Sequence, residues 1–152
     1  MKYQIGYTQA YNEINTVHDI LYDYNLKHTG KTRQEGVKAE VCNTTEALVV
    51  RSEDNRICGG LVWRTLTEPE RYVRVDLFVI GEELRGQGMG EKVFNEFITR
   101  AKSAGARYVK LYTNTFQAPG FYQKMGMEIE STKAAPLPDV PHNEHIDLIK
   151  YL

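Results

Sequence analysis

The chain has 152 residues, of which 41% are hydrophobic and 26% are charged, and it contains 12 glycines against 5 prolines. This length suits a single domain over residues 1–152, and the composition excludes a disordered or fibrous protein. The 19 Lys and Arg residues and the 20 Asp and Glu residues give a formal net charge of −1, which argues against nucleic acid as a partner.

The cysteines and the apolar segments indicate the cellular compartment. Cys42 and Cys58 are too few for a disulfide framework or a zinc cluster, so we expect reduced thiols and no bound metal. The first residues lack the apolar stretch of a signal peptide, and no run approaches the ~18 apolar residues of a membrane span. We therefore expect a cytoplasmic protein with no membrane partner.

The first half of the chain predicts a strand, a helix and a hairpin. Residues 2–7 alternate as a strand does, and Thr8 is a suitable N-cap for a helix that ends near residues 28–30. The stretch 31–45 is ambiguous, with a second short helix as one interpretation. Residues 46–52 and 57–65 are rich in β-branched and aromatic residues and flank turn-forming residues, so they predict an antiparallel hairpin.

The second half contains the clearest strand and the clearest helix. In residues 71–80 the pattern places Val73, Val75, Leu77 and Val79 on one face, which is typical of a central strand. Residues 89–104 have apolar side chains at helical spacing, and residues 107–113 predict the next strand. This order implies a right-handed crossover and parallel pairing inside a mixed sheet. A short helix is expected at 119–124, and the last two strands at 127–132 and 145–151. We also expect Trp63 and Tyr72 to pair across neighbouring strands.

A glycine-rich segment, Arg85-Gly86-Gln87-Gly88-Met89-Gly90, lies between that strand and that helix. Alternate glycines let the backbone turn tightly and present N–H groups at a helix N-terminus, where a phosphate is favoured. With the cation of Arg85, the segment predicts a diphosphate cradle. It lacks the Lys-Ser/Thr of a nucleotide P-loop, and its G-x-G-x-G spacing departs from the dinucleotide pattern G-x-G-x-x-G.

The segment resembles the acetyl-CoA loop of the GNAT N-acetyltransferase superfamily, [R/Q]-x-x-G-x-[G/A], at Arg85, Gly88 and Gly90. A second stretch, residues 116–127, is similar to the family segment A-x-x-F/L-Y-x-K-x-G-F. Its matching residues are Ala118, Phe121, Tyr122, Lys124 and Gly126. The resemblance implies a three-layer α/β fold. Its mixed sheet would be mostly antiparallel, with six or seven strands splayed between the fourth and the fifth and helices on both faces.

The resemblance also implies an activity, a co-substrate and its binding residues. Acetyl-CoA would donate its acetyl group to a primary amine by direct attack in a ternary complex, without a metal; the alternative is a non-catalytic module that senses acyl-CoA. The main chain of Phe78 and Val79 would bind the pantetheine arm, and Asn114 would replace the family's asparagine, whose place Thr115 takes. The residues implied around the diphosphate are Leu84, Arg85, Gly86, Gln87, Gly88, Met89, Gly90 and Glu91.

Candidate catalytic residues follow from the positions that the resemblance implies and from the proton donor and acceptor that amine acetylation needs. Tyr122 would lie near the sulfur and protonate the departing thiolate, since a phenol keeps its proton at neutral pH; the alternative is a core tyrosine. Asp76 is a candidate general base, with a structural carboxylate bonded to the backbone or to Arg74 as the alternative.

The acceptor and the assembly are less defined by the sequence. His142, His145 and Trp63 are candidates for the acceptor pocket, but no motif identifies the amine. The frequency of homo-oligomers predicts a homodimer.

Overall fold

The predicted helices and strands are present in the computed structural model, which describes residues 2–29, 44–117 and 119–152. Of the ambiguous stretch 31–45, residues 31–43 lie outside the described residues. The elements in chain order are β1 Tyr3–Thr8, α1 Tyr11–Thr29, β2 Thr45–Ser52, β3 Ile57–Leu66, β4 Tyr72–Ile80, the 3-10 helix η1 Glu82–Leu84, α2 Met89–Ser103, β5 Tyr108–Asn114, the 3-10 helix η2 Thr115–Gln117, α3 Pro119–Lys124, β6 Glu128–Ala134 and β7 Glu144–Tyr151.

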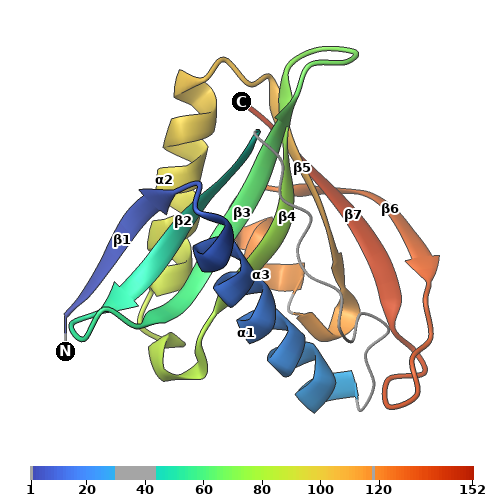
Figure 1. Ribbon diagram of the computed structural model, residues 1–152. Helices are drawn as coiled ribbons and strands as arrows, with labels where there is room; N and C mark the ends of the chain where they lie inside the picture. The colour runs from blue at the N-terminus through green and yellow to red at the C-terminus, as the bar shows by residue number, and fades with distance from the viewer. Residues whose placement is uncertain (1, 30–43, 118) are drawn as a thin grey trace.

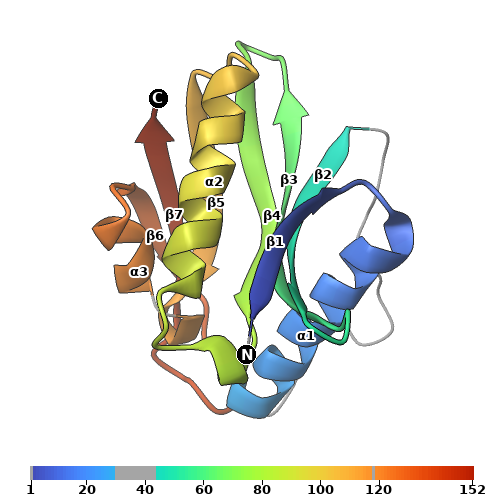
Figure 2. The ribbon, with the colours of Figure 1, turned by 90° about the vertical axis from the view of Figure 1, so that its left-hand side faces the viewer.

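Seven strands form one sheet in the order β1-β2-β3-β4-β5-β7-β6. The pair β4 and β5, joined through α2, is parallel, and the other five pairs are antiparallel. Helix α1 covers one face of the sheet, and α2 and α3 lie on the other (Figures 1 and 2). This arrangement confirms the predicted three-layer α/β fold with a mixed, mostly antiparallel sheet, and β4 is its middle strand.

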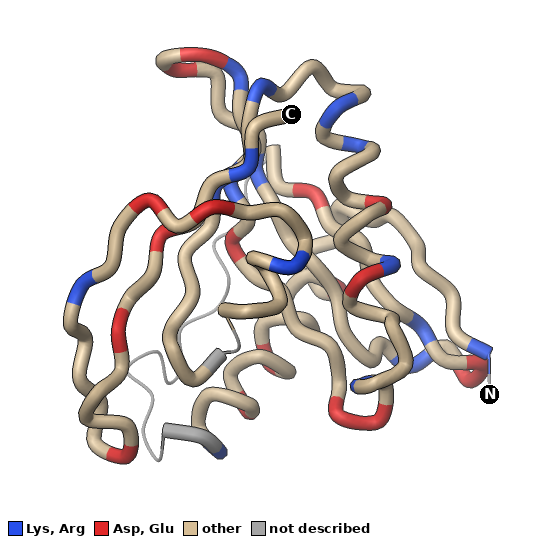
Figure 3. Tube along the Cα trace, turned by 180° about the vertical axis from the view of Figure 1, so that it is seen from behind, with Lys and Arg blue, Asp and Glu red and all other residues tan. Residues whose placement is uncertain are grey.

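The described residues also show how charge is distributed along the chain and how apolar its helices are. Acidic and basic residues lie interspersed along the described trace (Figure 3). None of the helices in the described segments combines the length and the apolar character that spanning a bilayer requires.

The register between β3 and β4 contains an irregularity at Asp76. Val62 pairs with Leu77, but the next residue of β3, Trp63, pairs with Val75. Asp76 is therefore an extra residue on β4, as in a β-bulge, which bends the strand and turns later side chains to the other face.

Because of this bulge, the single apolar face predicted for β4 is wrong. Val73 and Val75 belong to the core cluster that includes α2, whereas Val79, with Leu77 packed against it, belongs to the cluster that includes α1. An inserted residue inverts the period-two alternation, so side chains four residues apart lie on opposite faces. The apolar pattern alone does not reveal such an insertion.

The strands β4 and β5 separate after a short paired stretch. Among the described residues they are in register only at Val73 with Val109 and at Arg74 with Lys110. From residue 75 to residue 80 the edge of β4 that faces β5 has no strand partner in the described part of the chain. This confirms the splay between the fourth and fifth strands that the family resemblance implied.

The larger core cluster lies between the sheet and α2. Phe94 and Phe97 of α2 are fully buried there, and burying such a side chain contributes roughly 1.5–3 kcal/mol. Trp63 packs on Phe97 with ring centroids 5.1 Å apart, and its Nε1–H donates to Glu46 at 3.1 Å. Tyr72 instead stacks on a tyrosine of β5, so the predicted pairing of Trp63 with Tyr72 is wrong.

A pH-dependent contact joins the start of α1 to the sheet. The Glu13 carboxylate accepts hydrogen bonds from Thr8, at 2.6 Å, and from Arg51. These two hydrogen bonds, from Thr8 first, hold the pKa of Glu13 below its ordinary value. A lowered folded-state pKa contributes stability above the unfolded-state pKa, near 4.3, and that stability is lost as the pH falls through the folded-state value.

We therefore expect Glu13→Gln to lower the free energy of unfolding at pH 7 by about 1.5–3 kcal/mol, because it removes hydrogen bonds to a charged group. The difference from the wild-type protein should shrink as the pH falls below ~4. Urea unfolding at pH 7 and pH 3 measures both values, with Glu128→Gln on exposed β6 as the control. An equal loss at both pH values would contradict the assignment.

Candidate active site

A cavity of about 1080 Å³ occupies the splay between β4 and β5. Residues of α1, β4, the glycine loop, β5, α3 and the loop between β6 and β7 line it. Its size is at the upper end of the range for ligand sites. It brings together most of the predicted site residues, namely Asp76, Phe78, Val79, Leu84, Arg85, Gly86, Gly88, Met89, Gly90, Glu91, Asn114, Tyr122 and His145.

Three candidates lie away from the cavity wall in the described part of the chain. The Gln87 side chain turns back toward η1, where its Nε2 donates to the Glu83 carbonyl at 2.9 Å. Trp63 is buried beneath α2 and is not among the residues that line the cavity, so it does not line the acceptor pocket. His142 is exposed on the loop between β6 and β7 and is not among the lining residues.

The glycine loop has open space where a diphosphate would approach. Gly86 and Gly88 have φ values of 78° and 75°, in the left-handed region that favours glycine. A Cβ built on either residue would have no atom within 4 Å, and Gly88 is the N-cap of α2. The unpaired N–H groups and the positive dipole end of a helix N-terminus favour an anion at this place. The residues present therefore fit a diphosphate.

Arg85 connects the glycine loop to α1. Its Nε donates to the Ile80 carbonyl at 3.0 Å, and its guanidinium lies 4.6 Å from the centroid of the Tyr24 ring. The Tyr24 hydroxyl donates to the Phe116 carbonyl at 3.4 Å. Tyr24 was not predicted from the sequence, and it joins α1 to both sides of the cavity.

Tyr122 stands in an aromatic part of the cavity wall. Its ring centroid lies 6.1 Å from that of Phe78, 6.2 Å from that of Phe94 and 5.4 Å from that of Phe121. The residue is only 9% exposed, and burial raises the pKa of its hydroxyl. No hydrogen bond joins that hydroxyl to another described residue. Tyr122 thus keeps its proton at neutral pH.

Asp76 is held by an arginine that the sequence did not indicate. Arg64 Nε donates to Asp76 Oδ2 at 2.6 Å, and Arg64 Nη2 donates to Oδ1 at 3.0 Å. This is the bidentate geometry of a strong ion pair. Arg74, which the sequence suggested as partner, lies instead over the ring of Tyr112 at 6.0 Å. Both oxygens of Asp76 are engaged, which favours its structural interpretation over the base.

An asparagine pair spans β5 and the loop before β7. Asn143 Nδ2 donates to Asn114 Oδ1 and to the Ala135 carbonyl, each at 2.9 Å. Asn143 is only 4% exposed, and both asparagines line the cavity. No local pattern indicates Asn143, because its partners lie 29 and 8 residues away along the chain.

Comparison with known proteins agrees with this architecture. The profile of the Acetyltransferase (GNAT) family matches residues 14–127. This protein belongs to the GNAT acetyltransferase family. The matched range covers both GNAT segments recognised in the sequence and the splayed strands β4 and β5.

One relative and two solved structures show the extent of the likeness. Blasticidin-S acetyltransferase of Streptomyces morookaense is 33% identical over 90 residues, which are 59% of this chain and 61% of the relative. The match thus spans about three fifths of that protein's length. An acetyltransferase of the GNAT family from Streptococcus pneumoniae has a TM-score of 0.73 at 17% identity, over 99% of this chain and all of that one.

The second structure contains a ligand. It is a chain from Bacillus anthracis str. Ames, assigned as a streptothricin acetyltransferase and solved in complex with acetyl coenzyme A. Its TM-score is 0.61 at 17% identity, and the match covers 73% of this chain and 64% of that one. At this identity the likeness establishes a shared GNAT fold.

Proposed function

We propose that this protein transfers the acetyl group of acetyl-CoA to a primary amine, by direct attack of the amine in a ternary complex. The observation that carries the proposal is the cavity that extends from the glycine loop to the splay of β4 and β5. Its wall includes the glycine loop, which suits a diphosphate, and Tyr122, whose ring lies beside Phe78 on the open part of β4.

The chain would hold acetyl-CoA mainly through its backbone. The glycine loop would bind the diphosphate, and the unpaired edge of β4 at Phe78 and Val79 would bind the pantetheine arm as an added strand does. The N–H of Val79 would polarise the thioester oxygen, which requires a donor aimed at developing charge. Asn114, held by Asn143, would give a further polar contact.

Tyr122 would act as the acid for the departing thiolate. Its apolar surroundings raise its pKa, and they also raise the pKa of a thiol that leaves there, because burial disfavours both anions. The proton affinities of the donor and the acceptor therefore shift in the same direction. A phenol remains a usable donor under these conditions.

The acceptor is proposed as an amine on a small molecule. The relative from Streptomyces morookaense is named for blasticidin S, which makes that antibiotic the first acceptor to test. Spermidine, free amino acids and a peptide with a free N-terminus are the other acceptors. The homodimer and the absence of nucleic-acid and membrane partners stay predictions of the sequence.

The direct test measures binding and turnover separately. A ligand present at ~100 times its dissociation constant adds about 2.7 kcal/mol to stability, so CoA is expected to raise the melting temperature by roughly 5–11 °C. Thiol release from acetyl-CoA with the amines named above then reports transfer. An unmoved melting curve with no calorimetric binding would overturn the proposal. Binding without release in the presence of every amine would favour the acyl-CoA-sensing alternative.

A further inference from the structure

A histidine on the cavity wall has the surroundings of a proton acceptor. His145, near the start of β7, is in register with Asn114 of β5 at the splayed end of the sheet. It lines the cavity, and its ring stacks on Tyr112 with centroids 4.5 Å apart and an interplanar angle of 23°. The side chain is 34% exposed. The ring is thus fixed in orientation while it stays open to the cavity.

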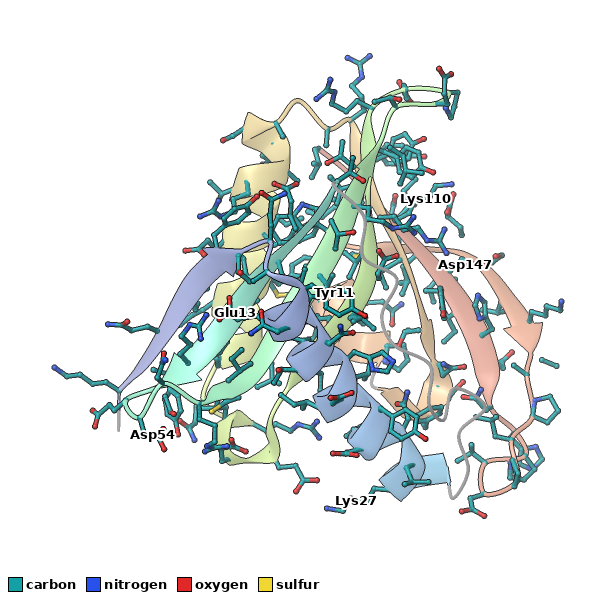
Figure 4. All side chains as sticks on the ribbon, in the orientation of Figure 1. Tyr11, Glu13, Lys27, Asp54, Lys110 and Asp147 are labelled. Atoms are coloured by element: carbon teal, nitrogen blue, oxygen red, sulfur yellow. The ribbon has the colours of Figure 1, made fainter. Side chains whose placement is uncertain are left out.

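A carboxylate orients this ring. Asp147 lies two residues along β7, on the same face of the strand, and its Oδ1 is 3.4 Å from His145 Nε2. The other oxygen, Oδ2, accepts a hydrogen bond from Ser131 of β6 at 2.9 Å. Figure 4 labels Asp147 on β7. A carboxylate beside Nε2 favours the tautomer with hydrogen on that nitrogen, which leaves the Nδ1 lone pair to accept a proton.

Nδ1 has no hydrogen-bond or ion-pair partner among the described residues. In the described segments, the charged and titratable groups facing the imidazole are Asp147 on its own strand, Tyr112 on β5, and Lys133, which is in register with His145 on β6. A fourth charged residue, Arg74 of β4, lies over the Tyr112 ring, with its guanidinium 6.0 Å from the ring centroid. Asp147 is the one anion among them, and it stabilises the protonated imidazole.

Asp76, the candidate for general base from the sequence, is less suited than His145 to accept a proton. Both of its carboxylate oxygens accept hydrogen bonds from Arg64. A proton placed on Asp76 would break at least one of these charge-assisted bonds. A proton placed on His145 would strengthen its contact with Asp147.

We propose that His145, positioned by Asp147, is the general base that deprotonates the acceptor amine; the inference rests on the proposed function. The ammonium proton moves to His145 Nδ1 and later to solvent. The freed nitrogen lone pair forms the C–N bond to the acetyl carbon as the C–S bond breaks. The sulfur takes the Tyr122 proton, and the remaining proton that the nitrogen must lose restores the tyrosine hydroxyl. The products are the N-acetyl amine and CoA thiol.

The test compares pH profiles of kcat/KM for acetyl transfer to blasticidin S and to spermidine. His145→Gln is expected to lower kcat by about 10²- to 10⁴-fold and to remove the dependence of kcat/KM on pH that a general base produces. Asp147→Asn should lower kcat by a smaller factor and leave KM for the amine almost unchanged, because the imidazole remains but loses the carboxylate that orients it. His142→Gln, in the neighbouring loop, is the matched control and should match the wild-type protein.

Calorimetric CoA binding, expected to be unchanged in every variant, separates a lost base from a lost cofactor site. Full activity with a wild-type profile in His145→Gln would overturn the proposal and leave the proposed function intact. If His145→Gln does not melt cooperatively, an Asp147→Asn protein with the kcat of the wild-type protein overturns it instead. If the wild-type protein releases no thiol with any amine, the proposed function fails and this inference with it.

Discussion

Tyr122→Phe is expected to lower kcat for acetyl transfer by about 10²- to 10⁴-fold and to leave acetyl-CoA affinity almost unchanged. The phenylalanine ring keeps the contacts with Phe78, Phe94 and Phe121, so only the proton donor is lost. Because the missing interaction acts in the transition state, kcat and kcat/KM should fall together.

Tyr108→Phe is a matched control for this substitution. Tyr108 is also 9% exposed, but it stacks on Tyr72 and does not line the cavity. Steady-state rates and melting temperatures on both variants separate a catalytic hydroxyl from a packing role. A Tyr122→Phe protein that is well folded and fully active would rule out the acid role and leave the thiolate to depart without it.

Gly88→Val is expected to abolish the thermal shift that CoA produces, which is roughly 5–11 °C for the wild-type protein. At a φ of 75° a β-branched residue is strained by about 1–3 kcal/mol, so the loop would change conformation. The new side chain would also occupy the open space beside the N-terminus of α2. Both effects remove the close approach of the backbone to a diphosphate.

Gly6→Val provides the control for this change. Gly6 lies on β1, away from the cavity, and a Cβ there would also have no atom within 4 Å. That variant should keep the full CoA shift, and Gly88→Ala should fall between the two. Calorimetry with CoA on the three variants checks the order. Undiminished binding by Gly88→Val would show that the glycine loop does not hold the diphosphate.

Local patterns in the sequence were enough to predict most elements and the glycine loop. The helix at α2, the hairpin of β2 and β3, and the turn at Gly86 and Gly88 depend on residues within a few positions of one another. Helical spacing, turn residues and the freedom of glycine at positive φ act over that range. The residues that resemble GNAT motifs lie in two such short segments, which is why the family and its fold were visible in the sequence.

The tertiary structure decided the chemistry of the acceptor side. The bulge at Asp76 reverses the side of the sheet on which the later side chains of β4 lie. Arg64 then forms an ion pair with Asp76, the carboxylate that the sequence suggested as the general base. Ser131 of β6 supports the contact of His145 with Asp147 by donating a hydrogen bond to Asp147. It reaches Asp147 because β7 lies between β5 and β6 in the sheet. Strand order and register join residues distant along the chain, and no spacing within a single segment records which strands will be neighbours.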